Sequence, residues 1–280
     1  MVLLSILRDY LQPNRVLITI GLLALFWLWE SVSPLLAGRK DRLRHAMRNL
    51  CLPVINGAIL FLTPGAATTV LSGWATRNQF GLLHTTPLSS GWRLIVSFVV
   101  LDLWAWLWHR ANHRSAFLWR FHRTHHSDFE MDVTTSARFH VGELAMAALT
   151  RLPVIVIAGL EPIHILVYET VLVAVSQFHH ANISVGCWDR FLRLLIVTPD
   201  VHKIHHSRIH LEMNSNFASV LSVWDRLGRS FHMRKSPKTV ELGLSQLMDP
   251  HWHSVGGMLR TPFLPVPLSS ADSEICDAPA

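Results

Sequence analysis

Apolar residues in this chain gather into runs long enough to cross a lipid bilayer. A membrane helix needs about 20 mostly apolar residues to span the hydrocarbon core. The first run extends from about Val16 to Ala37 and is interrupted by Glu30, and the second, from Cys51 to Ala75, contains no charged residue. A third run covers roughly Trp92 to Trp108. The pattern therefore predicts three membrane helices in the N-terminal part of the chain.

A further apolar stretch, from Glu143 to Phe178, is typical of a helical hairpin that turns near Leu160–His164. Its first arm carries Arg151, so the hairpin either crosses the membrane fully or re-enters it to half depth under cover of protein. In both cases an even number of crossings puts His179 and the residues after it on the same side of the membrane as His109.

A short basic loop sets the predicted orientation. The segment GRKDRLRHAMRN at residues 38–49 holds five Lys and Arg residues and one Asp. Short loops of this kind stay in the cytoplasm. We therefore expect an all-α, integral membrane bundle of about four membrane helices with a histidine-rich helical cap on the cytosolic side. Three regions follow: an anchor hairpin with its loops at 1–94, a catalytic region at 95–234, and a partly disordered C-terminal extension at 235–280.

Composition supports the membrane assignment. Half of the 280 residues are hydrophobic and only 16% are charged. The net charge of +6 comes from Lys and Arg between apolar segments, which favours membrane orientation over binding of nucleic acid. Cys51, Cys187 and Cys276 lie far apart, so neither a disulfide framework nor a thiolate zinc site is expected.

Candidate chemistry lies in the histidines. Three short motifs, HRANH, HRTHH and HKIHH, hold eight of the eighteen. They comprise His109, His113, His122, His125, His126, His202, His205 and His206. Residues at i, i+3 and i+4 project from one helix face, so each motif presents two or three rings to a common point. Helical bundles build metal sites in this way.

Neutral imidazole suits iron, zinc, copper and nickel. Eight rings exceed the needs of one ion, which points to two metals with open positions, and iron is the natural occupant if those positions bind dioxygen. In QFHHAN, His179 or His180 is a ninth candidate, of which we favour His180, and His140 is a tenth. The other histidines match no motif and are expected to be surface or packing residues.

Several further side chains have two readings. Asp102, two helical turns before His109, is either a carboxylate that accepts a hydrogen bond from a metal-binding histidine or a helix-packing residue. Glu130, Asp132 and Glu143 are candidates for the same role or ordinary solvated acids. The tryptophans at 104, 106, 108 and 119 are expected to form an aromatic belt at the membrane interface.

Residues 95–231 as a whole resemble the fatty acid hydroxylase/sterol desaturase superfamily of membrane non-haem di-iron enzymes. The chain is most similar in its organisation to bacterial members. The resemblance lies in DLWAWLWHRANH, FHRTHHSDFEMDVTTSARFHVGE, QFHHANI, TPDVHKIHHS and NSNFASVLSVWDRLGRSF, in the family's order. It implies a di-iron centre bound by the eight motif histidines and His180, with Asp102 and Asn182 as neighbours that serve catalysis.

The resemblance also implies an activity and its requirements. Such enzymes hydroxylate or desaturate a lipid such as a fatty acyl chain or sterol, with dioxygen as co-substrate. Electrons would come from a ferredoxin or cytochrome with its reductase. The expected location is a multi-pass membrane protein with its site on the cytoplasmic face, in the bacterial inner membrane or, in a eukaryote, the endoplasmic reticulum.

Two other functions stay open on the sequence. A metal transporter or storage protein would be expected to hold its ligands near the bilayer midplane. A zinc-dependent membrane hydrolase needs three ligands and a glutamate base. Iron and zinc analysis together with oxygen uptake separates the three classes.

Overall fold

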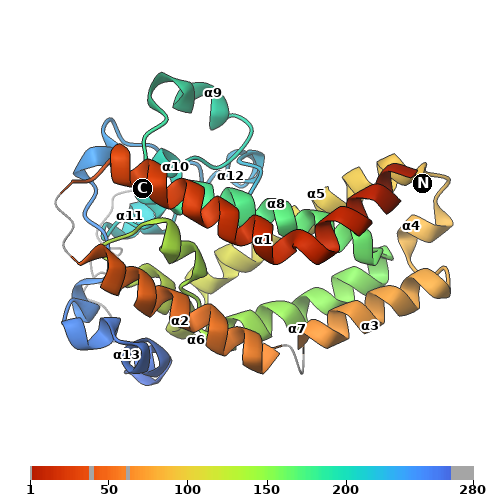
Figure 1. Cartoon of the computed structure of the whole chain (residues 1–280), viewed down its shortest axis with the longest axis horizontal. Helices are drawn as coiled ribbons and strands as arrows, with labels where there is room; N and C mark the ends of the chain where they lie inside the picture. Colours follow the sequence, from red (N-terminus) through yellow and green to blue (C-terminus); the bar gives the residue numbers. More distant parts are fainter. Residues whose placement is uncertain (1, 38–40, 61–63, 266–280) are drawn as a thin grey trace, which may run out of the picture.

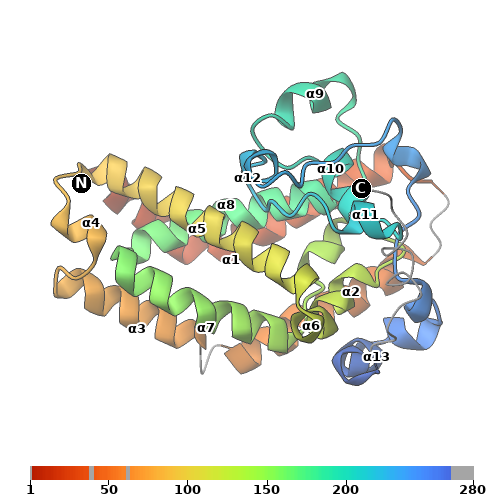
Figure 2. The ribbon, with the colours of Figure 1, turned by 180° about the vertical axis from the view of Figure 1, so that it is seen from behind.

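The structure is a computed structural model that describes residues 2–37, 41–60 and 64–265. The longest helices run along the long axis of the molecule, and shorter segments gather at one end (Figures 1 and 2). These segments, residues 115–140 and 181–265, are named the cap here. The long helices are α1 (Val2–Val32), α2 (Arg42–Leu60), α3 (Pro64–Arg77), α5 (Ser90–Arg114), α7 (Val141–Ala158) and α8 (Pro162–His180).

Short elements complete the fold. The short α-helices are α4 (Leu82–Thr85), α6 (Ala116–His126), α9 (Asp189–Leu192), α10 (Pro199–His205), α11 (His210–Met213), α12 (Val223–Leu227) and α13 (Val255–Arg260). The 3-10 segments are η1 (Val133–Ala137), η2 (Gly186–Trp188), η3 (Pro237–Thr239), η4 (Ser245–Leu247), η5 (Pro250–His253) and η6 (Thr261–Phe263). Extended pairing in the described ranges is limited to isolated β-bridges.

Within the described residues, three helices are long and apolar enough to cross a membrane. They are Leu4–Val32, Ser90–Arg114 and Val141–Ala158. The predicted class, an all-helical membrane protein, is therefore confirmed. The third helix is the arm that carries Arg151, and with α8 it forms the predicted hairpin, which turns at residues 159–161.

Two predicted boundaries were wrong. The first helix was predicted at 16–37, but it begins at Val2 and ends at Val32. Its N-terminal turns mix polar residues with exposed apolar ones such as Ile6, so the apolar run alone did not indicate where the helix begins. The second run, 51–75, is divided between α2 and α3, and residues 61–63 of that prediction lie outside the described residues.

The direction of each helix brings the predicted cap together. α5 and α8 both run toward the cap, whereas α7 runs away from it, so the C-terminal ends of α5 and α8 meet at the same end of the molecule (Figure 1). His109 and His180 lie at these two ends. The structure thus has the even number of helix passages between them that the sequence predicted.

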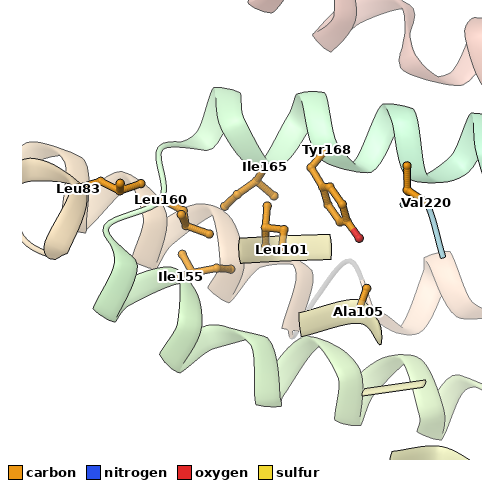
Figure 3. Close-up of a cluster of buried hydrophobic side chains, with 8 residues drawn as sticks. All are labelled: Leu83, Leu101, Ala105, Ile155, Leu160, Ile165, Tyr168 and Val220. Atoms are coloured by element: carbon orange, nitrogen blue, oxygen red, sulfur yellow. The ribbon is translucent and has the colours of Figure 1, made fainter. Parts of the chain in front are cut away.

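A hydrophobic core joins α5, α7 and α8 beyond the cap. It contains Leu101 and Ala105 of α5, Ile155 of α7, and Ile165 and Tyr168 of α8 (Figure 3). Around it, large apolar side chains such as Leu17 and Val54 are exposed, as expected for helices whose outer solvent is lipid. The core fixes the spacing of the helices that carry the histidines.

The far end of the α7–α8 hairpin needs glycine. Gly159 caps α7 in the left-handed conformation at φ 73°, which costs L residues free energy. A Cβ atom on Gly81 would lie 2.4 Å from the Gly159 Cα atom. This close approach fastens the segment before α4 to the hairpin turn.

The last described residues of the predicted C-terminal extension, up to 265, pack against α6. Arg123 on α6 donates hydrogen bonds to the carbonyls of Thr261 and Leu264 at 2.5 and 2.9 Å. Met258 is completely buried. The rest of this extension, which we predicted to be partly disordered, lies at residues 266–280, outside the described residues.

Candidate metal centre

Four helices deliver nine histidine rings to one place between the cap and the long helices. α5 carries two rings in its last turns, α6 carries three, α8 ends in one, and α10 with its C-cap residue carries three. They are His109, His113, His122, His125, His126, His180, His202, His205 and His206. The helical spacing orients the rings of each motif to one side, and the fold turns the four sides toward one another.

The nine rings form two neighbouring groups. In each group, one ring nitrogen per residue lies within 4.8 Å of all the others. The first group is His109, His113, His122, His126 and His205, and the second is His125, His180, His202 and His206. The groups touch, since the rings of His126 and His206 stack with centroids 4.4 Å apart. Each group can hold one ion.

The nitrogen spacing fits a metal ion at the centre of each group. The Nε2 atom of His109 lies 3.1 Å from that of His122 and 2.9 Å from that of His205. In the second group, the His180 Nε2 atom lies 3.1 Å from that of His125 and 3.0 Å from that of His202. Two imidazoles that bind one ion at about 2.1 Å and at right angles would place their nitrogens about 3 Å apart.

Burial adds a second reason to expect a metal. Both ring nitrogens of His113 and of His126 are buried and have no hydrogen-bond partner in the structure. An unsatisfied buried polar atom costs free energy. A bound metal ion would satisfy one nitrogen of each of these rings, as it would the facing nitrogens of the other rings.

Hydrogen bonds to backbone carbonyls on the outer side orient three of the rings. The Nδ1 atoms of His109 and His205 lie 2.8 and 2.7 Å from the carbonyl oxygens of Phe217 and Ser215. The Nδ1 atom of His180 lies 2.7 Å from a carbonyl oxygen of its own helix. Donation from Nδ1 leaves Nε2 unprotonated and directed to the centre, which is the tautomer that a metal ligand needs.

The three histidines of α10 and its C-cap residue are held neutral. Burial lowers the pKa of His205 to about 3, against the favourable hydrogen bond to its backbone acceptor. Burial first, and then the neighbouring histidines, hold the pKa values of His202 and His206 well below the usual value. Neutral imidazole is the form that binds a metal ion.

Glu143 is the carboxylate that touches the histidines. Its Oε1 atom lies 2.8 Å from the Nδ1 atom of His122, and Asn112 donates to the same oxygen at 3.3 Å. Its Oε2 atom is buried without a partner. The sequence offered Glu143, Glu130 and Asp132 as candidates for this role. Glu143 contacts a histidine of the first group, whereas Asp132 contacts His45, outside both groups.

The contacts of Asp102 are those of the second alternative, a helix-packing residue. Its carboxylate is fully buried and accepts hydrogen bonds from the Leu221 N–H, the Trp224 Nε1–H and the Tyr168 hydroxyl, at 3.0, 2.8 and 3.3 Å. These bonds join α5 to α8 and to residues 221–224 at the start of α12. Asp102 therefore holds these segments together, and its role in catalysis stays a prediction.

Asn182 also fastens the chain. Its side chain exchanges two hydrogen bonds with the backbone of Leu36, at 3.0 and 2.8 Å, and its N–H donates to Glu30 at 2.8 Å. Its side-chain amide is bound to the segment after α1, and its role in catalysis stays a prediction. This contact closes the cap over the end of α1.

The two additional histidine candidates differ. His140 caps α7: its Nδ1 atom accepts from the Gly142 N–H at 3.0 Å, and its Nε2 atom lies 3.2 Å from the Leu259 carbonyl. Both nitrogens are therefore occupied, which removes His140 as a ligand. His179 is buried and its ring centroid lies 3.9 Å from that of His202, but it is in neither group.

The histidines outside the motifs also lie outside the two groups. They are His45, His84, His164, His210, His232, His251 and His253. His45 nevertheless supports the site. Its ring lies between the carboxylates of Asp128 and Asp132, at 2.8 and 3.0 Å. Burial lowers its pKa, but the two carboxylates outweigh burial and raise the pKa to about 10. The charged ring ties α2 to the loop that follows α6.

A cavity of about 460 Å³ leads from the long helices to the histidines. Its walls include Leu144, Ala147 and Ala148 of α7, and Leu172 and Val173 of α8. Its lining also includes His109, His122, His125, His179, His180 and His202. A mostly apolar space thus borders both histidine groups.

The four tryptophans expected to form an interfacial belt lie on α5 and α6 in different surroundings. Trp104 and Trp108 stack with ring centroids 6.1 Å apart and line the cavity. Trp106 is buried and donates to Asp225 at 3.0 Å. Trp119 lies against the His113 ring, with centroids 5.1 Å apart. Trp104 and Trp108 lie on one face of α5 and Trp106 on another, so their closeness in sequence does not give the three rings the same surroundings.

The chain is similar in sequence to known lipid hydroxylases and monooxygenases. The family model "Fatty acid hydroxylase" matches residues 94–230. Ornithine lipid hydroxylase OlsE of Rhizobium tropici is 28% identical over 154 residues, 55% of this chain and 46% of that protein. Human alkylglycerol monooxygenase is 25% identical over 210 residues, 71% of this chain and 44% of that protein. Human cholesterol 25-hydroxylase is 24% identical over 172 residues, 60% of this chain and 61% of that protein.

The chain therefore spans less than half the length of the first two of these relatives. No solved structure matches it.

Metal content tests the two groups. Purified protein is expected to contain two metal ions per chain, and His205→Ala, which removes one ring from the first group, is expected to lower the content toward one. Glu143→Gln keeps the side-chain volume but weakens the acceptor for His122, so affinity for metal should fall by roughly 10- to 100-fold. Elemental analysis after graded chelation measures both. Unchanged metal in His205→Ala would contradict the assignment.

The anchoring role of Asp102 gives a separate prediction. Asp102→Ala leaves three buried donors without an acceptor, at a cost of at least about 3 kcal/mol. The melting temperature in detergent should fall clearly, whereas Asp102→Asn, which keeps one acceptor oxygen, should fall less. The folded fraction of either variant should keep its metal. A stable Asp102→Ala protein that has lost metal would show instead that Asp102 acts at the centre.

The pKa of His45 predicts a pH dependence. Because the folded-state pKa is raised from 6.5 to about 10, the stabilisation is complete below pH 6.5 and is lost as the pH rises through about 10. His45→Gln should lower the melting temperature at pH 7, and its difference from the unmodified protein should shrink toward pH 10.5. A difference that stays constant over this range would exclude a charged His45.

Proposed function

Because residues 94–230 belong to the fatty acid hydroxylase family, we propose that this protein is a membrane-bound, dioxygen-dependent oxidase that hydroxylates a membrane lipid. Two iron ions, bound by the nine histidines of the two groups, would serve as cofactor. The proposal assigns residues 95–234 to catalysis and residues 1–94 to the membrane anchor.

One observation carries the proposal: two touching groups of histidines border a mostly apolar cavity. A catalytic zinc site takes three protein ligands, so nine rings exceed what a zinc hydrolase needs. A transporter would be expected to hold its ligands near the midplane on broken helices, whereas these rings lie at the cap ends of α5 and α8. The arrangement favours an oxidase over both alternatives.

The cavity suits one chain of a lipid. The small side chains of Ala147 and Ala148 leave room along α7, and the stacked rings of Trp104 and Trp108 form a flat opposite wall. The chain's own residues thus bind the substrate, exclude water and direct one of its carbons toward the histidines. Glu143 keeps the proton of His122 on Nδ1 and so keeps Nε2 free.

The chemistry that the two iron ions supply when bound is the reductive activation of dioxygen. It requires electrons from outside, and we propose a ferredoxin or cytochrome with its reductase as the donor. The relatives' names specify hydroxylases and monooxygenases, which favours hydroxylation over desaturation for this chain.

Basic residues support a cytoplasmic position of the cap. Arg42, Arg44 and Arg48 begin α2, and Arg110 and Arg114 end α5, all at the cap end of the molecule. Lys and Arg beside membrane helices stay on the cytoplasmic side. We infer a multi-pass protein with its site on that face, in the bacterial inner membrane or, for a eukaryotic source, the endoplasmic reticulum.

Mass spectrometry of lipids tests the activity. Cells that express the protein should contain a lipid whose mass is higher by one oxygen atom than in cells without it. His126→Ala should abolish the product, whereas His210→Ala, which changes an exposed histidine outside both groups, should keep it. A product that lacks two hydrogen atoms would indicate desaturation. No change in any lipid with fully metal-loaded protein and a reductase present would contradict the proposal.

A further inference from the structure

One segment of the cap projects away from the rest of the molecule. Residues 186–195, named the α9 foot here, include α9 and extend sideways from the cap, perpendicular to the long helices, in both views (Figures 1 and 2). Measured along the long axis, α9 lies level with the C-terminal part of α1.

The surface of the α9 foot is apolar to an unusual degree. Trp188, Phe191, Leu194 and Leu195 are 67%, 52%, 58% and 70% exposed. Four large apolar side chains within eight residues leave water in contact with a continuous apolar patch, and such a patch marks an interaction surface.

The charges of the foot are basic where they are exposed. Arg190 is exposed, and its guanidinium lies 4.6 Å from the centroid of the Phe191 ring. The single acid, Asp189, is buried and forms an ion pair with Arg193 at 3.3 Å. The combination of Trp, Phe and Leu with exposed Arg is typical of segments that lie in the headgroup region of a membrane.

The foot is held firmly at its base. Ser222 and Arg226 both donate to the Arg193 carbonyl at 2.7 Å, and the Ser222 N–H donates to the Leu195 carbonyl at 3.1 Å. The backbone of the foot is therefore fixed in its outward position. Its apolar side chains are held out rather than folded back onto the cap.

The lipid-facing surface continues to the level of the foot. Large apolar side chains on α1 are exposed as far as its last residue: Leu28 is 63% and Val32 is 86% exposed, although Glu30 between them is buried. A bilayer that covers α1 over this length therefore reaches the height at which the foot projects.

We propose that the α9 foot rests in the headgroup region of the leaflet next to the cap, with its aromatic and leucine side chains in the lipid and Arg190 at the phosphates. It fixes the depth and tilt of the cap relative to that leaflet. The proposal depends on the membrane position of the long helices and not on the oxidase activity.

Fluorescence quenching tests this position through the exposed Cys187 of the foot. In a Cys51→Ser, Cys276→Ser background, Cys187 is labelled with a fluorophore and the protein is reconstituted into vesicles of phosphatidylcholine and phosphatidylglycerol. Nitroxides at the headgroup level of the lipids should quench the label, and iodide should quench it several-fold less than a label at Lys238→Cys. Lys238 is an exposed position on η3. A label at Ile20→Cys on α1 provides the reference for the hydrocarbon region.

Substituting Trp188→Ser and Phe191→Ser together should raise iodide quenching at Cys187 and leave the Ile20→Cys label unchanged, which shows that the helices remain inserted. Iodide quenching at Cys187 equal to that at Lys238→Cys, without nitroxide quenching, would overturn the proposal. Pyrene excimers at Cys187 that persist on dilution with lipid would overturn it in favour of contact with a second copy. No readout uses catalysis, so failure here is distinct from failure of the proposed function.

Discussion

The structure depends on bringing nine imidazole rings together, although several of their ring nitrogens have no hydrogen-bond partner. Their facing nitrogens lie about 3 Å from one another, a spacing that suits ligands of one ion and leaves several ring nitrogens otherwise unsatisfied. Hydrogen bonds on the outer side hold four of these rings, and packing between neighbouring rings and helices holds the others. The fold can be understood as the means by which the ends of α5, α6, α8 and α10 meet at this place.

The polar residues around the histidines divide this work. Glu143 and two backbone carbonyls, of Phe217 and Ser215, orient rings directly. Asp102 secures the segment that supplies the Phe217 carbonyl, since it binds Leu221 a few residues later. His45 ties α2 to the loop after α6. The apolar cavity and the histidines are thus fixed by the same helices, which is what positions a lipid chain against the centre.

Local spacing explains what the sequence predicted well. The i, i+3 and i+4 histidines share helix faces whatever the rest of the fold does, so the rings that would converge could be named before the structure, and long apolar runs revealed the helices. Contacts between distant residues were invisible. The pairing of His45 with Asp128 and the contact of His140 with Leu259 depend on how distant segments pack. The partners of Asp102 and Asn182 likewise lie in segments whose approach no sequence pattern indicated.

The position of the metal ions is the most direct test of this account. Anomalous diffraction at the iron edge, from crystals of the iron-loaded protein, would locate each ion relative to the rings. The account predicts two peaks, one among His109, His113, His122, His126 and His205 and the other among His125, His180, His202 and His206. A single peak shared by both groups, or peaks away from these rings, would contradict it.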